Sequence, residues 1–187
     1  KNKCAIHTKF SSNANWSYDW SSICTSMVYV PDDNFEKALI DLGYDDVIDD
    51  YVLTANISGV TSLDVSEKEI SDLTGIEDFT ALTSLNCENN QLTSLDVSSN
   101  TALSTLRCNE NSFTSLDLSS NTVLTGLYCQ QNQLTILDVS NNTSLIDLQC
   151  PNNLLTSLDV SVNAALTSLE VHNNQLTYLN MKNGVTD

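Results

Sequence analysis

The chain has 187 residues, with 24 acidic and 7 basic side chains and a formal net charge of −17. Binding to nucleic-acid phosphates needs clustered Lys and Arg, so this charge argues against nucleic acid and against anionic membrane surfaces. It fits basic partners, metal cations or a simple solvated acidic surface. No apolar run reaches the roughly 18 residues of a membrane span, and no signal peptide is visible. We therefore expect no membrane insertion, and a chain that is a mature or excised portion of its protein.

Residues 1–27 do not repeat and form the first predicted unit, a flanking segment bracketed by two cysteines. Cys4 and Cys24 lie in a polar stretch with little core of its own. We expect a disulfide between them, which implies an oxidising compartment. Trp16 and Trp20 favour packing of this segment onto its neighbour, with a ligand platform as the alternative.

Residues 28–59 form the second predicted unit, an N-terminal helical cap. The sequence from Val30 to Gly43 carries helix signals: Asp33 as a cap, Glu36 three residues later as its capping-box partner, and Gly43 at the C′ position. One face of this helix is apolar, with Phe35, Leu39 and Leu42 at helical spacing. Such a helix can cover the first coil of a solenoid.

An acidic loop follows the helix and offers weak calcium candidates. Calcium takes oxygen ligands from clustered carboxylates, but this loop lacks the spacing of an EF-hand. Solvated turn carboxylates are the simpler interpretation, so we predict no metal site and no cofactor. The four candidates are Asp45, Asp46, Asp49 and Asp50.

Residues 60–187 form the third predicted unit, an array of one 22-residue coil and five 21-residue coils, the last incomplete. A fixed period in this range indicates a solenoid. The first coil, from Val60, has apolar residues every three positions, which suits a 3₁₀-like return path. These residues are Ile70, Leu73, Ile76 and Phe79. The later coils begin at Leu82, Leu103, Leu124, Leu145 and Leu166.

Each 21-residue coil carries two strand-like strings, L-x-C-x-x-N and L-x-V-x-x-N, as in residues 85–90 and 95–100. We therefore predict a leucine-rich-repeat solenoid, mainly parallel β, with strands on both sides of coils two to five, low curvature and one capping helix. Two asparagine columns should satisfy backbone groups at the turns. They are Asn90, Asn111, Asn132, Asn153 and Asn174, and Asn100, Asn121, Asn142 and Asn163.

The cysteine column of the repeats predicts buried free thiols. Stacked strands lie about 4.8 Å apart, whereas a disulfide needs Cβ atoms about 3.8 Å apart. Val171 fills the same column in the last coil, so the position requires apolar volume rather than sulfur chemistry. The column comprises Cys87, Cys108, Cys129 and Cys150.

The two outer faces of the coils differ in variability. The return side is uniform, with Asp96, Asp117, Asp138 and Asp159 each followed by Ser98, Ser119, Ser140 or Ser161; a structural role is favoured over cation binding. The L-x-C side differs in every coil and is the candidate binding face. Its columns are Asn86, Arg107, Tyr128, Gln149 and Glu170, then Glu88, Asn109, Gln130, Pro151 and His172. Arg and Tyr are enriched at interface hot spots.

The repeat LxxLxCxxNQLTSLDVSxNTA resembles bacterial leucine-rich repeats of the nested 21-residue class called IRREKO, and the 22-residue coil resembles an internalin-type repeat. The block from Val28 to Ser66 resembles the N-terminal cap of such secreted proteins. The stretch from Cys4 to Cys24 resembles their cysteine-bracketed C-terminal flank. The end resembles the start of a closing segment, with Gly184 where the column has Asn.

This resemblance implies a secreted or surface-attached bacterial recognition module, such as an internalin-like adhesin binding a protein on a host or neighbouring cell. A structural spacer and a glycan-binding module are the alternatives. Catalysis finds little support, because His7 and His172 lie far apart and no catalytic grouping or phosphate loop appears. We therefore predict a non-catalytic protein.

Overall fold

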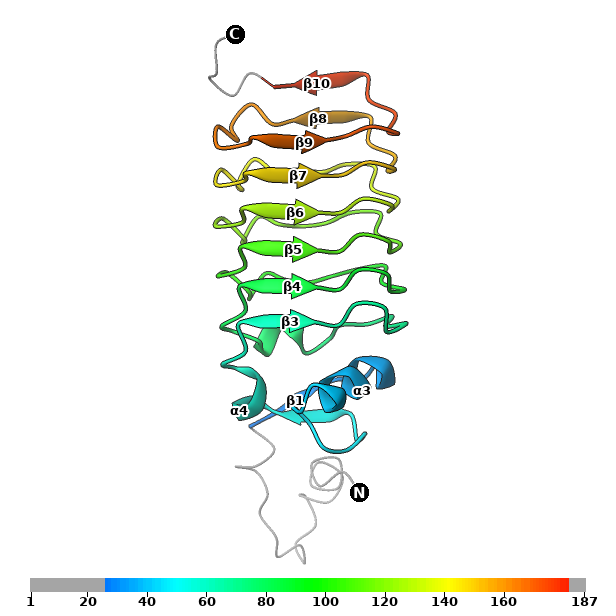
Figure 1. Cartoon of the computed structure of the whole chain (residues 1–187), viewed down its shortest axis with the longest axis vertical. Coiled ribbons are helices and arrows are strands. Elements are labelled where there is room, and N and C mark those ends of the chain that lie inside the picture. The colour runs from blue at the N-terminus through cyan, green and yellow to red at the C-terminus, as the bar shows by residue number, and fades with distance from the viewer. Residues whose placement is uncertain (1–25, 182–187) are drawn as a thin grey trace, which may run out of the picture.

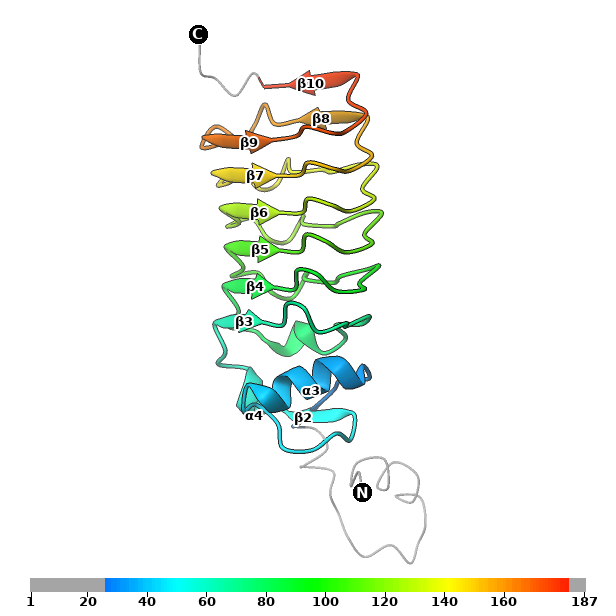
Figure 2. The ribbon, with the colours of Figure 1, turned by 45° about the vertical axis from the view of Figure 1, so that its right-hand side comes forward.

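A computed structural model of the chain describes residues 26–181, which form a nearly straight stack of coils with a cap at its N-terminal end (Figure 1). Turning the molecule by 45° shows the same straight stack (Figure 2), as expected for low curvature. Among these residues, no helix has the length and apolar character needed to cross a membrane. The predicted Cys4–Cys24 disulfide, the packing of Trp16 and Trp20, and the departure at Gly184 lie outside the described residues, as does His7.

The cap, as far as it is described, consists of a two-stranded antiparallel sheet and two helices. Strand β1 (Met27–Tyr29) pairs with β2 (Tyr51–Leu53), while helix α3 (Asp33–Asp41) covers the first coil and α4 (Thr54–Ile57) leads into it. The single predicted helix is therefore joined by a second one of four residues.

The apolar face of α3 is confirmed in part. Phe35 and Leu39 are fully buried, and the Phe35 ring lies 6.4 Å from that of Phe79 in the first coil. Leu42 is 45% exposed, because the helix ends at Asp41 and Leu42 is the C-cap residue. Gly43 follows with a φ of 80°, in the predicted C′ position.

The prediction that Asp33 caps the helix is wrong by one residue. Asp32 is the N-cap, and its Oδ1 accepts hydrogen bonds from the backbone N–H groups of Asn34 and Phe35 at 2.9 and 3.0 Å. Its Oδ2 accepts from the backbone N–H and the hydroxyl of Ser71 at 2.9 and 2.7 Å. One carboxylate therefore joins the start of α3 to the first coil.

The predicted capping box is also wrong, because Glu36 turns away from the start of the helix. Its Oε1 accepts hydrogen bonds from the backbone N–H groups of Asp49 and Tyr51 at 2.9 and 3.1 Å. Glu36 thus holds the loop before β2 against α3. The sequence has the three-residue spacing of a capping box, but the backbone N–H groups of Asp49 and Tyr51 are better placed to donate to the Glu36 carboxylate.

The first coil follows the predicted path. Ile70, Leu73, Ile76 and Phe79 are all buried, and a 3₁₀ turn, η1 (Ile76–Asp78), lies on the return side. Gly75 precedes this turn with a φ of 104°, and a Cβ there would lie 2.9 Å from the carbonyl oxygen of Tyr29. The close approach of β1 to this turn therefore requires glycine.

Six short parallel strands form the main sheet of the described solenoid, one from each coil. They are β3 (Ser62–Asp64), β4 (Ser84–Asn86), β5 (Thr105–Arg107), β6 (Gly126–Tyr128), β7 (Asp147–Gln149) and β9 (Ser168–Glu170). The central leucine of each strand pairs with the central leucine of the next. Because strand side chains alternate, each leucine points inward and the two flanking residues point outward.

The return side departs from the prediction of strands on both sides. Strands occur there only in the last two described coils, where β8 (Ser157–Asp159) pairs in parallel with β10 (Tyr178–Asn180). The N–H of Thr177 bonds to the carbonyl of Thr156 at 2.9 Å, whereas the matching bond from Thr135 to Thr114 is 3.4 Å. The earlier return segments keep the preceding inter-coil bond, as from Gln133 to Phe113 at 2.9 Å, but this next bond is too long to continue a regular ladder.

The two asparagine columns are structural ladders, as predicted. Asn132 Nδ2 donates to the carbonyls of Cys108 and Cys129, and its Oδ1 accepts from the N–H of Phe113. In the second column, Asn121 Nδ2 donates to the carbonyls of Val97 and Asn100, both at 3.0 Å. The side chains thus satisfy backbone groups that the turns leave unpaired.

The cysteine column also agrees with the prediction. Cys87, Cys108, Cys129 and Cys150 are buried free thiols. Burial raises the pKa of Cys87 and of Cys150 to about 12, and raises that of Cys108 and Cys129 well above the ordinary value. These thiols are therefore protonated and unreactive at neutral pH.

Candidate binding face

The predicted middle column lies on one face of the main sheet. Its residues occupy the third position of successive strands and pair with one another from coil to coil. Arg107 and Glu170 are exposed, and the other three are half-buried. The column in order is Asn86, Arg107, Tyr128, Gln149 and Glu170.

The second predicted column lies at the end of the strands and is less open. Asn109 is only 6% exposed and Pro151 is buried, so the expectation that these positions point toward a partner is wrong for both. Glu88 and Gln130 are half-buried, while His172 is exposed.

The coils lie close together around Asn109. The chain turns at Glu110, where φ is 54°, and the backbones of neighbouring coils stay hydrogen-bonded there. The N–H of Asn89 donates to the carbonyl of Asn109, and the N–H of Glu110 donates to the carbonyl of Gln130, both at 3.0 Å. Side chains one strand spacing apart therefore cover each other.

Three side chains from adjacent strands form a contact group, here called the Tyr128 cluster: Arg107, Tyr128 and Asp147. The Arg107 guanidinium carbon lies 4.2 Å from the centroid of the Tyr128 ring, a cation–π contact. The Tyr128 hydroxyl donates a hydrogen bond to Asp147 Oδ2 at 2.9 Å. Burial, followed by the Asp147 hydrogen bond and charge, raises the pKa of Tyr128.

Gly126 makes room for this arrangement. A Cβ at Gly126 would lie 3.1 Å from Cε2 of Tyr128, so the ring lies back over the glycine. Neither Gly126 nor Asp147 was among the predicted site residues. Their column otherwise holds Ser62, Ser84, Thr105 and Ser168, and this break in a row of small hydroxyl residues beside Tyr128 is the signal that identifies them.

The aspartate column on the return side forms local turns. In each coil the Asp Oδ1 accepts from the backbone N–H of the Ser two residues later, at 2.9–3.0 Å. Hydrogen bonds from the serine hydroxyls and backbone N–H groups lower the pKa of all four carboxyls. These contacts support the structural interpretation of Asp96, Asp117, Asp138 and Asp159.

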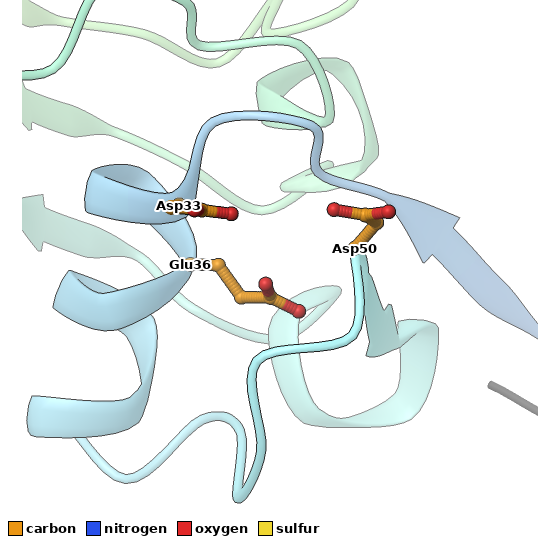
Figure 3. A group of neighbouring side chains, drawn as sticks. All are labelled: Asp33, Glu36 and Asp50. Carbon is orange, nitrogen blue, oxygen red and sulfur yellow. The ribbon is translucent and has the colours of Figure 1, made fainter. Parts of the chain in front are cut away.

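The weak calcium candidates do not come together as a set. Among the described residues, the group of three acids close enough to hold one ion is Asp33, Glu36 and Asp50, drawn in Figure 3. Of the predicted candidates Asp45, Asp46, Asp49 and Asp50, only Asp50 belongs to it. Glu36 was missed because its capping-box spacing suggested a different partner.

Comparisons with known proteins identify relatives that share the fold and the repeats. No protein-family model matches the sequence. Internalin J of Listeria monocytogenes is 42% identical over 72 residues, which are 38% of this chain and 8% of the relative. A solved functional domain of InlJ from Listeria monocytogenes, described as including a cysteine ladder, is 39% identical with a TM-score of 0.76. This match covers 86% of this chain and 37% of that one.

In both sequence and fold, this chain is therefore similar to the leucine-rich-repeat domains of internalins. A leucine-rich-repeat protein of Leptospira interrogans shares the fold, with 22% identity and a TM-score of 0.63 over 65% of this chain and 33% of the other. The internalin-like chain spans only 8% of its curated relative and 37% of the solved InlJ domain. It therefore corresponds to only a part of these relatives.

Proposed function

We propose that this internalin-like chain is a non-catalytic recognition module of a secreted or cell-surface bacterial protein, and that the outer face of its main sheet binds a protein partner. The observation that carries the proposal is the contrast between the two sides of the coils. The return side repeats Asp-x-Ser in local turns, whereas the main sheet presents a different residue in each coil. A face whose chemistry varies along its length offers a partner a specific pattern of groups, which the uniform return side does not.

The Tyr128 cluster supports a protein partner over a glycan. Arg107 lies over the Tyr128 ring and the ring lies back over Gly126, so the aromatic surface open for stacking on a sugar is reduced. The same contacts hold an Arg and a Tyr in fixed positions. Fixed aromatic and guanidinium groups lose little conformational entropy on binding, which is why such residues dominate protein interfaces.

A parallel screen tests the class of partner. The purified chain is presented to host-cell surface proteins and to a glycan array, beside an Arg107→Ala/Tyr128→Ala variant whose fold is checked by thermal melting. The proposal expects a protein captured by the parent and lost by the variant. A glycan lost in the same way would favour the glycan alternative, and partners retained by the variant would favour the spacer interpretation.

A further inference from the structure

Three carboxylates meet in the cap, far in sequence from the binding face. Asp33 and Glu36 belong to α3, and Asp50 immediately precedes β2. One oxygen from each lies within 4.8 Å of the others. Figure 3 shows Asp33 and Asp50 pointing toward one another from opposite segments, with the Glu36 carboxyl group between the two backbones.

Glu36 is the unusual member of this group, because its side chain is 0% exposed. Its Oε1 is held by the N–H groups of Asp49 and Tyr51, but its Oε2 is buried without a hydrogen-bond partner. A buried carboxylate oxygen without a partner is costly, so such an atom indicates a missing proton or cation. Burial raises the pKa of Glu36, which reflects the same cost.

No basic side chain among the described residues forms an ion pair with this group. The ion pair found in residues 26–181 joins Lys37 to Asp41, one turn apart on α3. The three carboxylates therefore face each other without a compensating side-chain charge. The net charge of −17 adds to their repulsion and favours binding of a cation.

We propose that Asp33, Glu36 and Asp50 bind a hard divalent cation of the calcium class. Calcium takes six to eight oxygen ligands at about 2.3–2.6 Å, so opposite ligands lie about 5 Å apart, which is compatible with the spacing of these oxygens. Two exposed carboxylates leave positions for water, and calcium tolerates such irregular sets. Magnesium demands a near-ideal octahedron and suits this site less well.

The bound ion would join two separate segments of the cap. It would link the first turn of α3 to the residue before β2, next to the loop that Glu36 already holds. Asp50 has a φ of 67°, a conformation that an ion bound to its side chain would help to maintain. The expected result of binding is a more stable cap, with no change in the distant sheet face.

Thermal melting of the full chain tests the site. The protein is stripped with EDTA and melted with CaCl₂, with MgCl₂, or with NaCl of equal ionic strength. Calcium at about a hundredfold excess over its Kd should raise Tm by about 5–10 °C, and magnesium should raise it less. Terbium, used as a luminescent calcium substitute near Tyr51, should bind and be displaced by calcium.

Matched variants separate a site from general charge screening. Asp33→Asn, Asp50→Asn and Glu36→Gln should each remove most of the calcium response, while Asp41→Asn, on the exposed end of the same helix, should keep it. Asparagine at position 50 tolerates the positive φ, so this variant stays informative if Glu36→Gln fails to fold. A parent without a calcium response, or an equal response in all four variants, would overturn the proposal.

Discussion

Asn142 shows what a single side chain contributes to the stack. It is 1% exposed, and its Nδ2 donates to the carbonyls of Leu118 and Asn121 at 3.0 and 2.9 Å. Its removal would leave two buried carbonyl groups without these donors. Asn142→Ala should therefore lower the free energy of unfolding by about 2–4 kcal/mol, whereas Asn141→Ala, at the exposed neighbour, should change it by less than about 0.5 kcal/mol. Urea unfolding of both variants measures the difference; equal effects would contradict the ladder.

The buried thiols predict a loss of stability in alkali. The pKa of Cys87 and of Cys150 is raised from 9.0 to about 12 in the fold. A raised thiol pKa contributes full stability below the unfolded value of 9.0, and this contribution is lost as pH rises toward 12. The free energy of unfolding should therefore fall between these pH values.

Valine at Cys87 and Cys150 supplies the control for that prediction. Val65 and Val171 occupy the same column in the first and last coils, so the site accepts this side chain. A Cys87→Val/Cys150→Val variant should lose less stability than the parent across the same pH range in urea titrations. An identical loss in both proteins would assign the alkaline effect to other groups.

At the scale of elements, the start of α3 depends on Asp32. The carboxylate caps the helix and also accepts hydrogen bonds from Ser71, so its loss affects two elements. Asp32→Ala should lower the free energy of unfolding by about 1–3 kcal/mol. In EDTA, Asp33→Ala should have a much smaller effect, because Asp33 is not the cap. A larger effect at Asp33 would mean that Asp33 caps the helix, as the sequence predicted.

The repeat made the inward residues predictable from sequence. An inward leucine, cysteine or asparagine has the same neighbours in every coil, so one period determines its burial and its partner. Cys108 and Asn121 were placed correctly for this reason. The cap has no such repetition. Glu36 matched a local capping pattern, but its partners, Asp49 and the first residue of β2, lie thirteen and fifteen residues later.

The outer face was less predictable because it depends on contacts between columns. A comparison down one column identified Arg107 and Tyr128, but the hydrogen bond from Tyr128 crosses to Asp147 in the neighbouring column. The burial of Asn109 depends on how closely adjacent turns approach. The absence of strands from the early return segments goes with a longer backbone hydrogen bond at Thr135, a difference that the near-identical return sequences do not predict.

At the scale of the whole molecule, the solenoid separates stability from recognition. The buried inward columns and the asparagine ladders hold the stack together, while the outer residues of the main sheet carry few of these contacts. Arg107→Ala/Tyr128→Ala should therefore melt within about 3 °C of the parent, because surface changes alter stability little. Differential scanning calorimetry measures this; a large fall in Tm would mean that the Tyr128 cluster is structural.

The affinity of a captured partner for two matched double variants tests the central claim most directly. Arg107→Ala/Tyr128→Ala changes the sheet face, and Ser94→Ala/Ser115→Ala changes exposed positions on the return side. Calorimetric titration should show Kd rising by about thirtyfold or more for the first variant, as expected for loss of an interface hot spot. The second variant should bind as the parent does. Unchanged binding by the first variant, or weakened binding by the second, would contradict the assignment of recognition to the main sheet.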